Sequence, residues 1–589
     1  MVLPSPVAPW TGAPLRVLFV ADKPVAGELS LIAPDGSVAA KTATRHGGPP
    51  YFWYAEVKSP AAGEWHARLA RRQAPAGCDT ITHDIAVRAD RPPAPHAAAG
   101  SVWPLRHSWN RATENLFSAW IAKLFDAPPE AEESWKALHF VLRDKSRNFL
   151  FDYLGLREDE IGLVIRPDCA DNPYFLRAYF AFKMGLPFGF SQCSRGGDGR
   201  PPRCYGWSSV LNAAAGQQQG LSASFARYLR VLADGVQTGN ARAPAADSNT
   251  DFYTVPLTQN TLRPGTVYAD PYGHVLMLVK RVPQVGGKPG VFLAVDAEPD
   301  GTVTRKRFWR GNFLFAQDRA LGSPGFKRFR PIVRDKNGGM RRLSNREIAA
   351  DPQYGDFSLE QSKLGVEDFY DKMDDVMSPA PLDPAPAMKD AITSLEEQVQ
   401  TRVVAVENGR KYLIKKPGEI GMPNGAAIFQ TTGPWEDFST PARDFRLLIA
   451  IDVVRGYPDR VARRAAHYKI PPGKSIADVK AELQNVLAAE LAKRKFSYTR
   501  SDGSSWPLTL KDVLDRMQKL EMGYNPNDCV ELRWGAPPNS KEAATCKRHA
   551  PAAQRAKMAQ YRPWFQKRHW PVHVARAAPA EANRRASTR

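Results

Sequence analysis

The sequence predicts a multidomain α+β protein, and three observations support this fold class. Its 589 residues allow roughly three to four domains of ordinary size. Short strand-like segments fill residues 1–90, helix-like and strand-like segments mix within 100–345, and helical patterns dominate 390–574. The basic segment 575–589 contains little that can pack, and we expect a disordered tail there.

The first region has the pattern of a small β-sandwich of immunoglobulin-like type. Four apolar segments, LRVLFVA, GELSLIAP, YFWYAEV and EWHARLA, are separated by turn residues such as Pro34, Asp35 and Gly36. Strands of this length and spacing are typical of all-β sandwiches. Residues 91–100 are rich in Pro and Ala, and they predict a linker to the next domain.

The central region alternates between helical and strand patterns. Apolar spacing predicts helices over 108–125, 134–155 and 166–188. Residues 190–206 contain Gly, Pro and Arg and predict a loop, and 262–315 contain the strongest strand patterns. We therefore expect a mixed α+β domain here.

The sequence pattern changes after about residue 345. Residues 376–388 predict a Pro-rich linker, and 402–416 (RVVAVENGRKYLIKK) predict a short strand-like stretch. A helix is expected over 440–456, because Thr-Pro begins it and Gly ends it. A further helix is expected to begin at Ser475, with Asp478 three residues later.

The net charge is +20, which favours anionic partners such as nucleic acid, anionic lipid or an acidic wall polymer. Half of this excess lies in residues 541–589, where twelve Lys and Arg stand against two Glu. A solvated basic end is the simplest interpretation. No run of about 18 apolar residues predicts a membrane span, and no signal peptide is recognisable at the start. The protein is therefore cytoplasmic, or its true N-terminus precedes this sequence.

Six cysteines are present, and four of them form two closely spaced pairs. Cys193 and Cys204 flank one loop, and Cys529 and Cys546 flank another, so two local disulfides are predicted. Reduced thiols are the alternative. A metal site is a weaker alternative for the neighbouring set Cys529, Cys546, His549, His569 and His573, whose spacing fits no common zinc module. Cys78 and Cys169 are left unpaired. Disulfides favour a periplasmic or extracellular location.

Cys169 is the candidate nucleophile. Pro167 prevents a helix before it and Pro173 fits the first turn of a helix after it. An apolar stripe continues that helix through Phe175, Leu176, Tyr179, Phe180 and Met184. The helix dipole and free N–H groups at such a position favour a thiolate, and they can hold a developing oxyanion. The alternative is a small buried hydrophobic residue.

A thiolate nucleophile requires a base, and His274 directly precedes a strongly apolar strand. The next strand ends at Asp296. If the two strands form a hairpin centred near residue 286, His274 faces about residue 298, and Asp296 lies at the same end of the sheet. Glu298 takes this role if the register slips. Alternatively, His274 and Asp296 are ordinary residues at strand ends.

These motifs together resemble the NlpC/P60 branch of papain-like cysteine hydrolases. They are Asp-Cys-Ala-Asp at a helix start, Pro-Gly-Thr-Val, Gly-His-Val before a strand, and a polar residue on the next strand, all within about 165–300. The resemblance implies a papain-like fold, with Cys169 as nucleophile, His274 as base and Asp296 as the orienting residue. It also implies hydrolysis of amide bonds in bacterial peptidoglycan stem peptides through an acyl-enzyme. No cofactor and no metal are expected.

Further assignments extend from this resemblance. Asp168 and Glu298 are secondary catalytic candidates, and the predicted substrate-binding residues are Tyr174, Tyr272 and Trp207. The sequence departs from the family in two ways: Ala-Asp follows Asp-Cys where a Ser-Gly type pair is usual, and 105 residues separate the cysteine from the histidine. Residues 190–260 are then an inserted cap.

Two other functions remain open from the sequence. One is a non-catalytic protein that binds the cell wall or acts as a scaffold. The other is binding of nucleic acid or another polyanion through the basic C-terminal region, which we consider the weaker of the two. No phosphate-binding loop or Gly-x-Ser-x-Gly motif is present. The Gly-rich loop 195–200 and the aromatic-basic stretch 561–570 have simpler explanations, as a loop and a packed helix.

Overall fold

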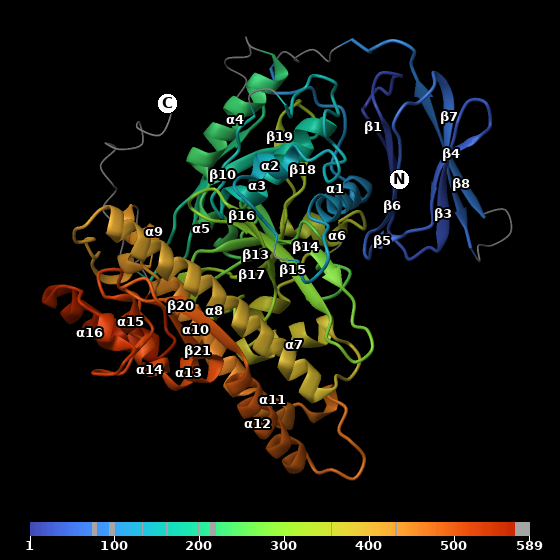
Figure 1. Cartoon of the computed structure of the whole chain (residues 1–589). Helices are drawn as coiled ribbons and strands as arrows, with labels where there is room; N and C mark the ends of the chain where they lie inside the picture. The colour runs from blue at the N-terminus through green and yellow to red at the C-terminus, as the bar shows by residue number, and fades with distance from the viewer. Residues whose placement is uncertain are drawn as a thin grey trace.

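The computed structural model of the chain has a mixed α+β architecture, with antiparallel sheets at the N-terminal end and mainly helices at the C-terminal end (Figure 1). The structure describes residues 1–72, 79–93, 100–131, 133–160, 163–196, 199–211, 220–354, 356–429 and 433–571. Among these residues, every helix is too short or too polar to cross a bilayer. The predicted tail 575–589, most of the linker 91–100 and Cys78 lie outside the described residues.

The N-terminal region forms two four-stranded antiparallel sheets. One has the order β1 (Val2–Ser5), β2 (Leu15–Ala21), β6 (Tyr51–Val57) and β5 (His46–Gly47). The other has the order β4 (Val38–Thr42), β3 (Gly27–Ile32), β7 (Gly63–Arg71) and β8 (Thr80–Val87). Alternate residues of both sheets share one core, including Val17, Leu29, Trp53, Trp65 and Leu69. The four predicted strands are therefore confirmed.

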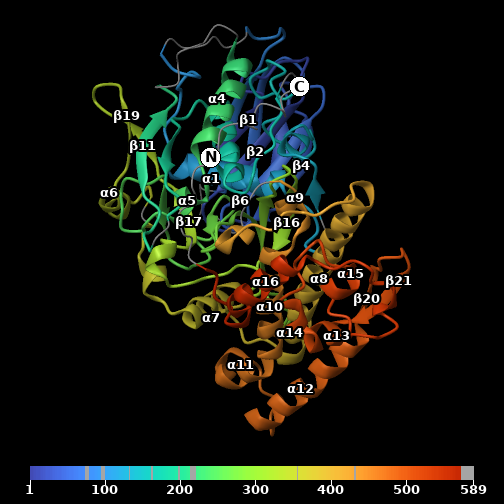
Figure 2. The ribbon, with the colours of Figure 1, turned by 90° about the vertical axis from the view of Figure 1, so that its left-hand side faces the viewer.

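The first sheet also packs against the central region, as Figures 1 and 2 show. Leu3, Leu18, Val20 and Phe52 belong to the central core rather than to the sandwich core. The Arg16 guanidinium donates to the carbonyl of Phe151 at 2.5 Å and is nearly buried. The sandwich is thus joined to the next region by apolar packing and buried hydrogen bonds.

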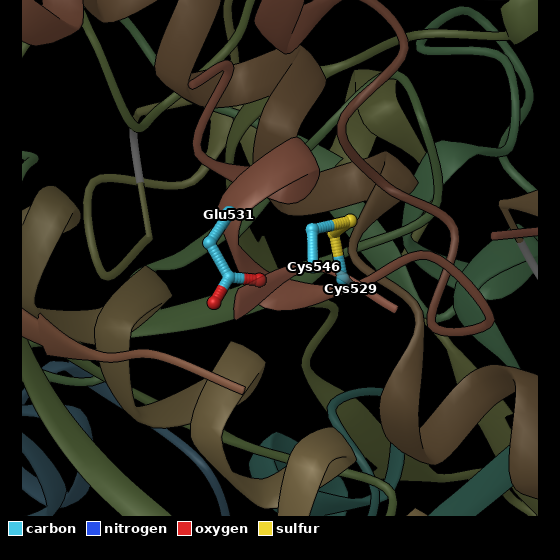
Figure 3. A group of neighbouring side chains, drawn as sticks. All are labelled: Cys529, Glu531 and Cys546. Carbon is cyan, nitrogen blue, oxygen red and sulfur yellow. A yellow bond between two sulfur atoms is a disulfide. The ribbon is translucent and has the colours of Figure 1, made fainter. Parts of the chain in front are cut away.

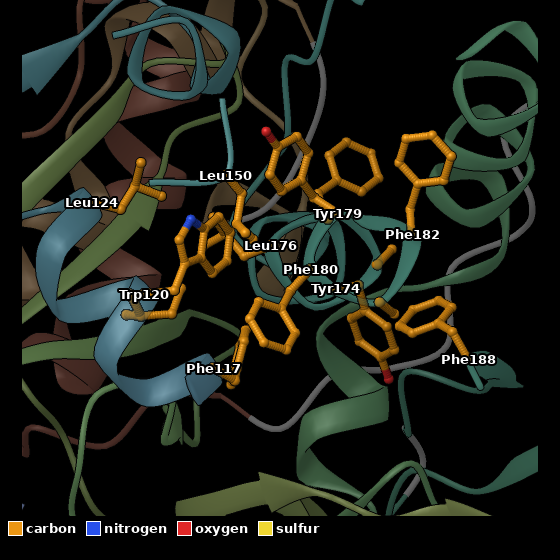
Figure 4. Packing of buried hydrophobic residues seen from close by; sticks show 14 of the residues in the cluster. Phe117, Trp120, Leu124, Leu150, Tyr174, Leu176, Tyr179, Phe180, Phe182 and Phe188 are labelled. Atoms are coloured by element: carbon orange, nitrogen blue, oxygen red, sulfur yellow. The ribbon is translucent and has the colours of Figure 1, made fainter. Parts of the chain in front are cut away.

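Two helices form the centre of the main core. Figure 4 shows the side chains of α1 (Arg111–Leu124) and α3 (Asp171–Met184) pointing toward one another. The Trp120 ring stacks on Tyr179 at 5.5 Å between ring centroids, and Phe117 meets Phe180 edge-on at 5.3 Å. Every residue of α3 is buried, so this helix is fixed on all sides.

The predicted helix over 134–155 is wrong. This segment contains only β9 (Ser134–Trp135) and the short helix α2 (Leu138–Leu142), followed by turns. Asp152 and Gly155 adopt positive φ angles of 50° and 70°, which lie outside the helical region. Most apolar residues of this segment are buried in the main core although the chain is irregular, whereas Phe140 is exposed.

The central sheet is antiparallel and positions the candidate site. Its order is β12 (Phe252–Thr254), β17 (Gly325–Phe329), β13 (Val267–Ala269), β14 (Val275–Val282), β15 (Val291–Ala297), β16 (Val303–Arg307) and β9. Met277 pairs with Val295. The same register continued to the strand ends places His274 opposite Glu298, as the hairpin prediction required.

The described residues of the predicted cap, 190–260, include a helix that packs on α3. The expected loop 190–206 is confirmed in its described middle part, but strands form its two ends: β10 (Gly189–Cys193) and β11 (Cys204–Ser209), with Cys193 paired to Cys204. The helices α4 (Leu221–Gly235) and α5 (Thr238–Arg242) follow. Phe182 of α3 stacks on Phe225 of α4 at 4.3 Å, so the segment shares the main core.

The chain then passes through β18 (Ile332–Arg334), β19 (Met340–Arg342), α6 (Asn345–Ala350) and α7 (Val366–Met377). The C-terminal part contains α8 (Pro384–Lys415), α9 (Pro434–Phe438), α10 (Pro441–Arg455), α11 (Tyr457–Arg463), α12 (Ile476–Lys493), β20 (Lys495–Thr499), β21 (Ser505–Thr509), α13 (Leu510–Asp515), α14 (Met517–Leu520), α15 (Val530–Arg533) and α16 (Ala552–Gln566). The predicted helices at 440–456 and from Ser475 are confirmed, the latter with its Ser475–Asp478 capping box.

The strand-like prediction for 402–416 is wrong, because these residues lie within the 32-residue helix α8. Val399, Arg402, Val406 and Gly409 are buried at helical spacing. Arg402 forms a buried bidentate ion pair with Asp444 of α10, at 2.8 and 2.9 Å. The helix also begins at Pro384, inside the expected linker. Trp309 and Leu314 of the central region join the C-terminal core, so the two regions pack together.

Candidate active site

Cys169 lies two residues before the first residue of α3, as the sequence predicted. Its thiol is free and half-buried. Asp168 shapes this helix start: one carboxylate oxygen accepts from the N–H groups of Ala170 and Asp171, at 2.8 and 2.9 Å. The Asp168 carbonyl accepts from the Asn172 N–H at 3.1 Å. The sulfur therefore lies at the positive end of a buried helix.

This arrangement corrects two expectations. The N–H groups of Ala170, Asp171 and Asn172 already bond to Asp168, so they are not free to hold an oxyanion. Asp168 itself acts on the backbone that presents Cys169. This contact indicates a structural role for its carboxylate, in place of the direct catalytic role considered from the sequence.

His274 follows a tight turn that brings it to Cys169. The turn spans Asp270–Gly273, and Gly273 has a φ of 92°, a conformation that favours glycine. The Gly273 carbonyl lies 3.9 Å from the Cys169 sulfur. The Asp270 N–H donates to the His274 carbonyl at 2.8 Å and closes the turn. Two segments 105 residues apart in the sequence thus meet.

Asp296 orients the imidazole from the neighbouring strand β15. Its Oδ2 lies 2.7 Å from Nε2 of His274, and its carboxylate is fully buried, whereas the His274 side chain is 24 % exposed. Since Nε2 faces the carboxylate, Nδ1 is the ring nitrogen left for the thiol. Burial alone would lower the pKa of His274, but the charge of Cys169 and hydrogen bonds to Asp296 and Cys169 raise that pKa to about 10. The structure brings Cys169, His274 and Asp296 together.

Lys306 of β16 is a site residue that the sequence reading missed. Its ammonium lies 2.5 Å from Oδ2 of Asp296 and 3.0 Å from Glu298. Burial opposes the ammonium form, but these two carboxylates raise the pKa of Lys306 above its ordinary value. The Lys306 charge in turn holds the pKa of Glu298 well below its usual range. Glu298 therefore pairs with Lys306, while Asp296 is the residue that bonds His274.

The pairing of β15 with β16 could have identified Lys306 as a site residue. Ala294 pairs with Lys306 and Asp296 with Thr304, so Lys306 is the diagonal neighbour of Asp296 on one face of the sheet. Beyond this pair, Arg443 of α10 lies 4.0 Å from Glu298. Charges therefore alternate from His274 through Asp296, Lys306 and Glu298 to Arg443.

The three predicted substrate-binding residues lie in different surroundings. The prediction that Tyr174 binds substrate is wrong, because its side chain is 1 % exposed and its hydroxyl donates to Asp251 at 2.7 Å. Trp207 lies on β11 with the Arg342 guanidinium 5.5 Å from its ring centre. Tyr272 lies in the turn beside His274, and its ring stacks at 5.0 Å on a tryptophan of the C-terminal region. Contact of Trp207 and Tyr272 with a substrate stays a prediction.

The four paired cysteines form the two expected disulfides. Cys193–Cys204 joins the two strands of the β10–β11 hairpin, and Cys529–Cys546 closes a loop in the C-terminal region. Figure 3 shows Glu531 beside the second disulfide. Cys529, Cys546 and Glu531 lie close enough together to hold a metal ion. However, the two sulfurs are bonded to each other, and the Glu531 carboxylate accepts from the N–H and the hydroxyl of Ser501, both at 2.7 Å. His573, part of the alternative metal set, lies outside the described residues.

Comparison with known proteins gives no relative for this chain. No protein-family model, curated protein or solved structure matches it.

Proposed function

We propose that the protein is a cysteine hydrolase that cleaves an amide bond, with peptidoglycan stem peptides as its substrate. The observation that carries this proposal is the Cys169–His274–Asp296 arrangement. It places a free, half-buried thiol at a helix start, an imidazole near enough to that thiol for the Cys169 charge to raise the pKa of His274, and a buried carboxylate 2.7 Å from the far ring nitrogen. A nucleophile, a base and an orienting group in this order are what acyl transfer requires.

The proposed reaction proceeds through an acyl-enzyme. The Cys169 thiolate attacks the substrate carbonyl carbon, and His274 in its imidazolium form gives a proton to the departing amine as the C–N bond breaks. His274 then takes a proton from water, which attacks the thioester and releases the acid. Asp296 keeps the imidazole in one orientation throughout. We assign the N–H of Cys169 itself to the oxyanion, because the next three N–H groups are bonded to Asp168.

The choice of substrate rests on the resemblance of the sequence around Cys169 and His274 to NlpC/P60 hydrolases. Two further features support it. The two disulfides favour an oxidising compartment, and the peptidoglycan layer lies outside the cytoplasm. The net charge of +20 suits an acidic cell-wall polymer as a docking partner. We therefore place the enzyme in the periplasm or outside the cell.

The test is hydrolysis of purified peptidoglycan and of synthetic stem peptides, with the products identified by mass spectrometry. Cys169→Ala should release no new amine or carboxyl end, while the wild-type protein cleaves at a single type of bond. Tyr174→Phe is the matched control, because it alters the same helix away from the sulfur and should keep activity. Equal product release by wild type and Cys169→Ala would rule out the proposal.

A further inference from the structure

The turn that carries His274 is fixed mainly by groups outside its own strand. Within the turn, Asp270 accepts the Tyr272 N–H on its side chain at 2.8 Å and the Gly273 N–H on its carbonyl at 3.3 Å. On one side Arg242 of α5 donates to the Pro271 carbonyl at 3.4 Å. The position of the imidazole therefore depends on what holds Asp270.

Asp270 is held by Arg446, which belongs to helix α10 of the C-terminal region. The guanidinium lies 2.6 Å from Oδ2 of Asp270 and also 3.4 Å from the carbonyl of Asn312. The Asp270 carboxylate has no exposed surface, and the Arg446 side chain is 19 % exposed. A carboxylate buried this completely requires a cationic partner. Arg446 forms the ion pair with it, and the nearby charge of Arg242 adds a weaker attraction.

Aromatic packing from the same region covers the outer side of the turn. The Tyr272 ring stacks on Trp570 at 5.0 Å and an interplanar angle of 13°, and it meets Phe445 edge-on at 5.7 Å. Phe445 is fully buried and precedes Arg446 on α10. Two adjacent residues of one helix thus contact the two residues that flank Pro271.

We propose that Arg446 is a positioning residue for the Cys169–His274 pair, acting through Asp270. The C-terminal helical region is then part of the catalytic unit and not an independent binding module. This inference rests on the proposed function, because it assigns Arg446 a role in that reaction. Loss of Arg446 removes the ion-pair partner of the Asp270 carboxylate, so the turn shifts and the imidazole leaves the thiol.

The experiment measures alkylation of Cys169 by iodoacetamide in the full-length protein between pH 5 and pH 9, and it needs no substrate. Arg446→Met should lower the rate at pH 7 by about tenfold and move the pH profile, whereas Arg446→Lys should recover part of the rate. Arg455→Met is the matched control, because Arg455 is exposed at the other end of α10 and should give the wild-type profile. The charged groups that act on His274 in this profile are Cys169, Asp296 and Glu298, and Lys306 and Arg443 pair with these carboxylates.

A double variant separates positioning from simple misfolding. If Arg446 acts through Asp270, Arg446→Met should change the rate by less than about twofold in an Asp270→Asn background, where the carboxylate that Arg446 pairs with is already absent. An equal loss in both backgrounds would overturn the inference, as would a wild-type profile in Arg446→Met. The proposed function fails separately, if His274→Ala alkylates Cys169 as fast as the wild type does. Thermal unfolding of each variant identifies those that are folded.

Discussion

Replacing Asp296 by asparagine removes the negative charge that lies between His274 and Lys306 while keeping the shape of the side chain. In the wild-type protein, Oδ2 of Asp296 accepts from His274 at 2.7 Å and from Lys306 at 2.5 Å. A hydrogen bond to a charged group is worth about 1.5–3 kcal/mol, and one pKa unit corresponds to about 1.36 kcal/mol. Losing the bond to the imidazolium should therefore lower the pKa of His274 by about 1–2 units from its value of about 10.

The assay is an NMR titration of protein labelled at histidine, with a His274→Gln variant to assign the signal. Glu298→Gln is the matched control, since Glu298 bonds the same lysine without bonding the imidazole. It should shift the His274 titration less than Asp296→Asn does. An unchanged titration in Asp296→Asn, or equal shifts in the two variants, would refute the reasoning.

The raised pKa of His274 also predicts how the stability of the protein depends on pH. The pKa of His274 in the folded protein, about 10, lies above the ordinary histidine value of about 6.5. The imidazolium therefore stabilises the fold in full below about pH 6.5, and this contribution is lost as the pH rises through about 10. The difference in unfolding free energy between wild type and Asp296→Asn should be larger at pH 6 than above pH 10. A difference that grows with pH would contradict this sign.

Other predictions concern the framework around the site. Replacing Cys529 and Cys546 by serine opens a loop with a sequence separation of 17 and should lower the unfolding free energy by about 3 kcal/mol; unchanged denaturant midpoints would contradict the pairing. Arg402→Met leaves the buried Asp444 unpaired and should cost about 3–5 kcal/mol in urea unfolding, whereas Arg402→Met with Asp444→Leu should recover most of that loss. Tyr174→Phe should destabilise the fold by about 1–3 kcal/mol without changing the alkylation rate of Cys169; a slower rate would place Tyr174 in the site.

The parts of the site that sequence predicted well depend on short-range geometry. Pro167 and Pro173 restrict where a helix can begin, so Cys169 could be placed at a helix start without knowledge of the rest of the fold. The hairpin about residue 286 determines which residue faces His274, once the one-residue register shift between Leu278 and Lys280 is included. Local strand pairing therefore places His274 and Asp296 at the same end of the sheet.

The parts that sequence missed depend on contacts between distant segments. Arg446 lies 176 residues from Asp270, and no local pattern predicts that contact. Tyr174 was expected to bind substrate, but α3 is buried all round, so the exposure of a helix face could not be inferred from its own spacing. Residues 402–416 have β-branched side chains that favour strands, and packing of α8 against α10 overrides that preference.

The proposal that Cys169 and His274 act as a reactive pair is tested most directly by the alkylation of Cys169 at pH 6. At this pH an ordinary thiol, with a pKa of about 8.5, is almost fully protonated and reacts slowly. The paired imidazolium predicts that wild-type Cys169 reacts with iodoacetamide at least about tenfold faster than Cys169 in His274→Ala. Equal rates in the two proteins at pH 6 would show that His274 does not activate the thiol.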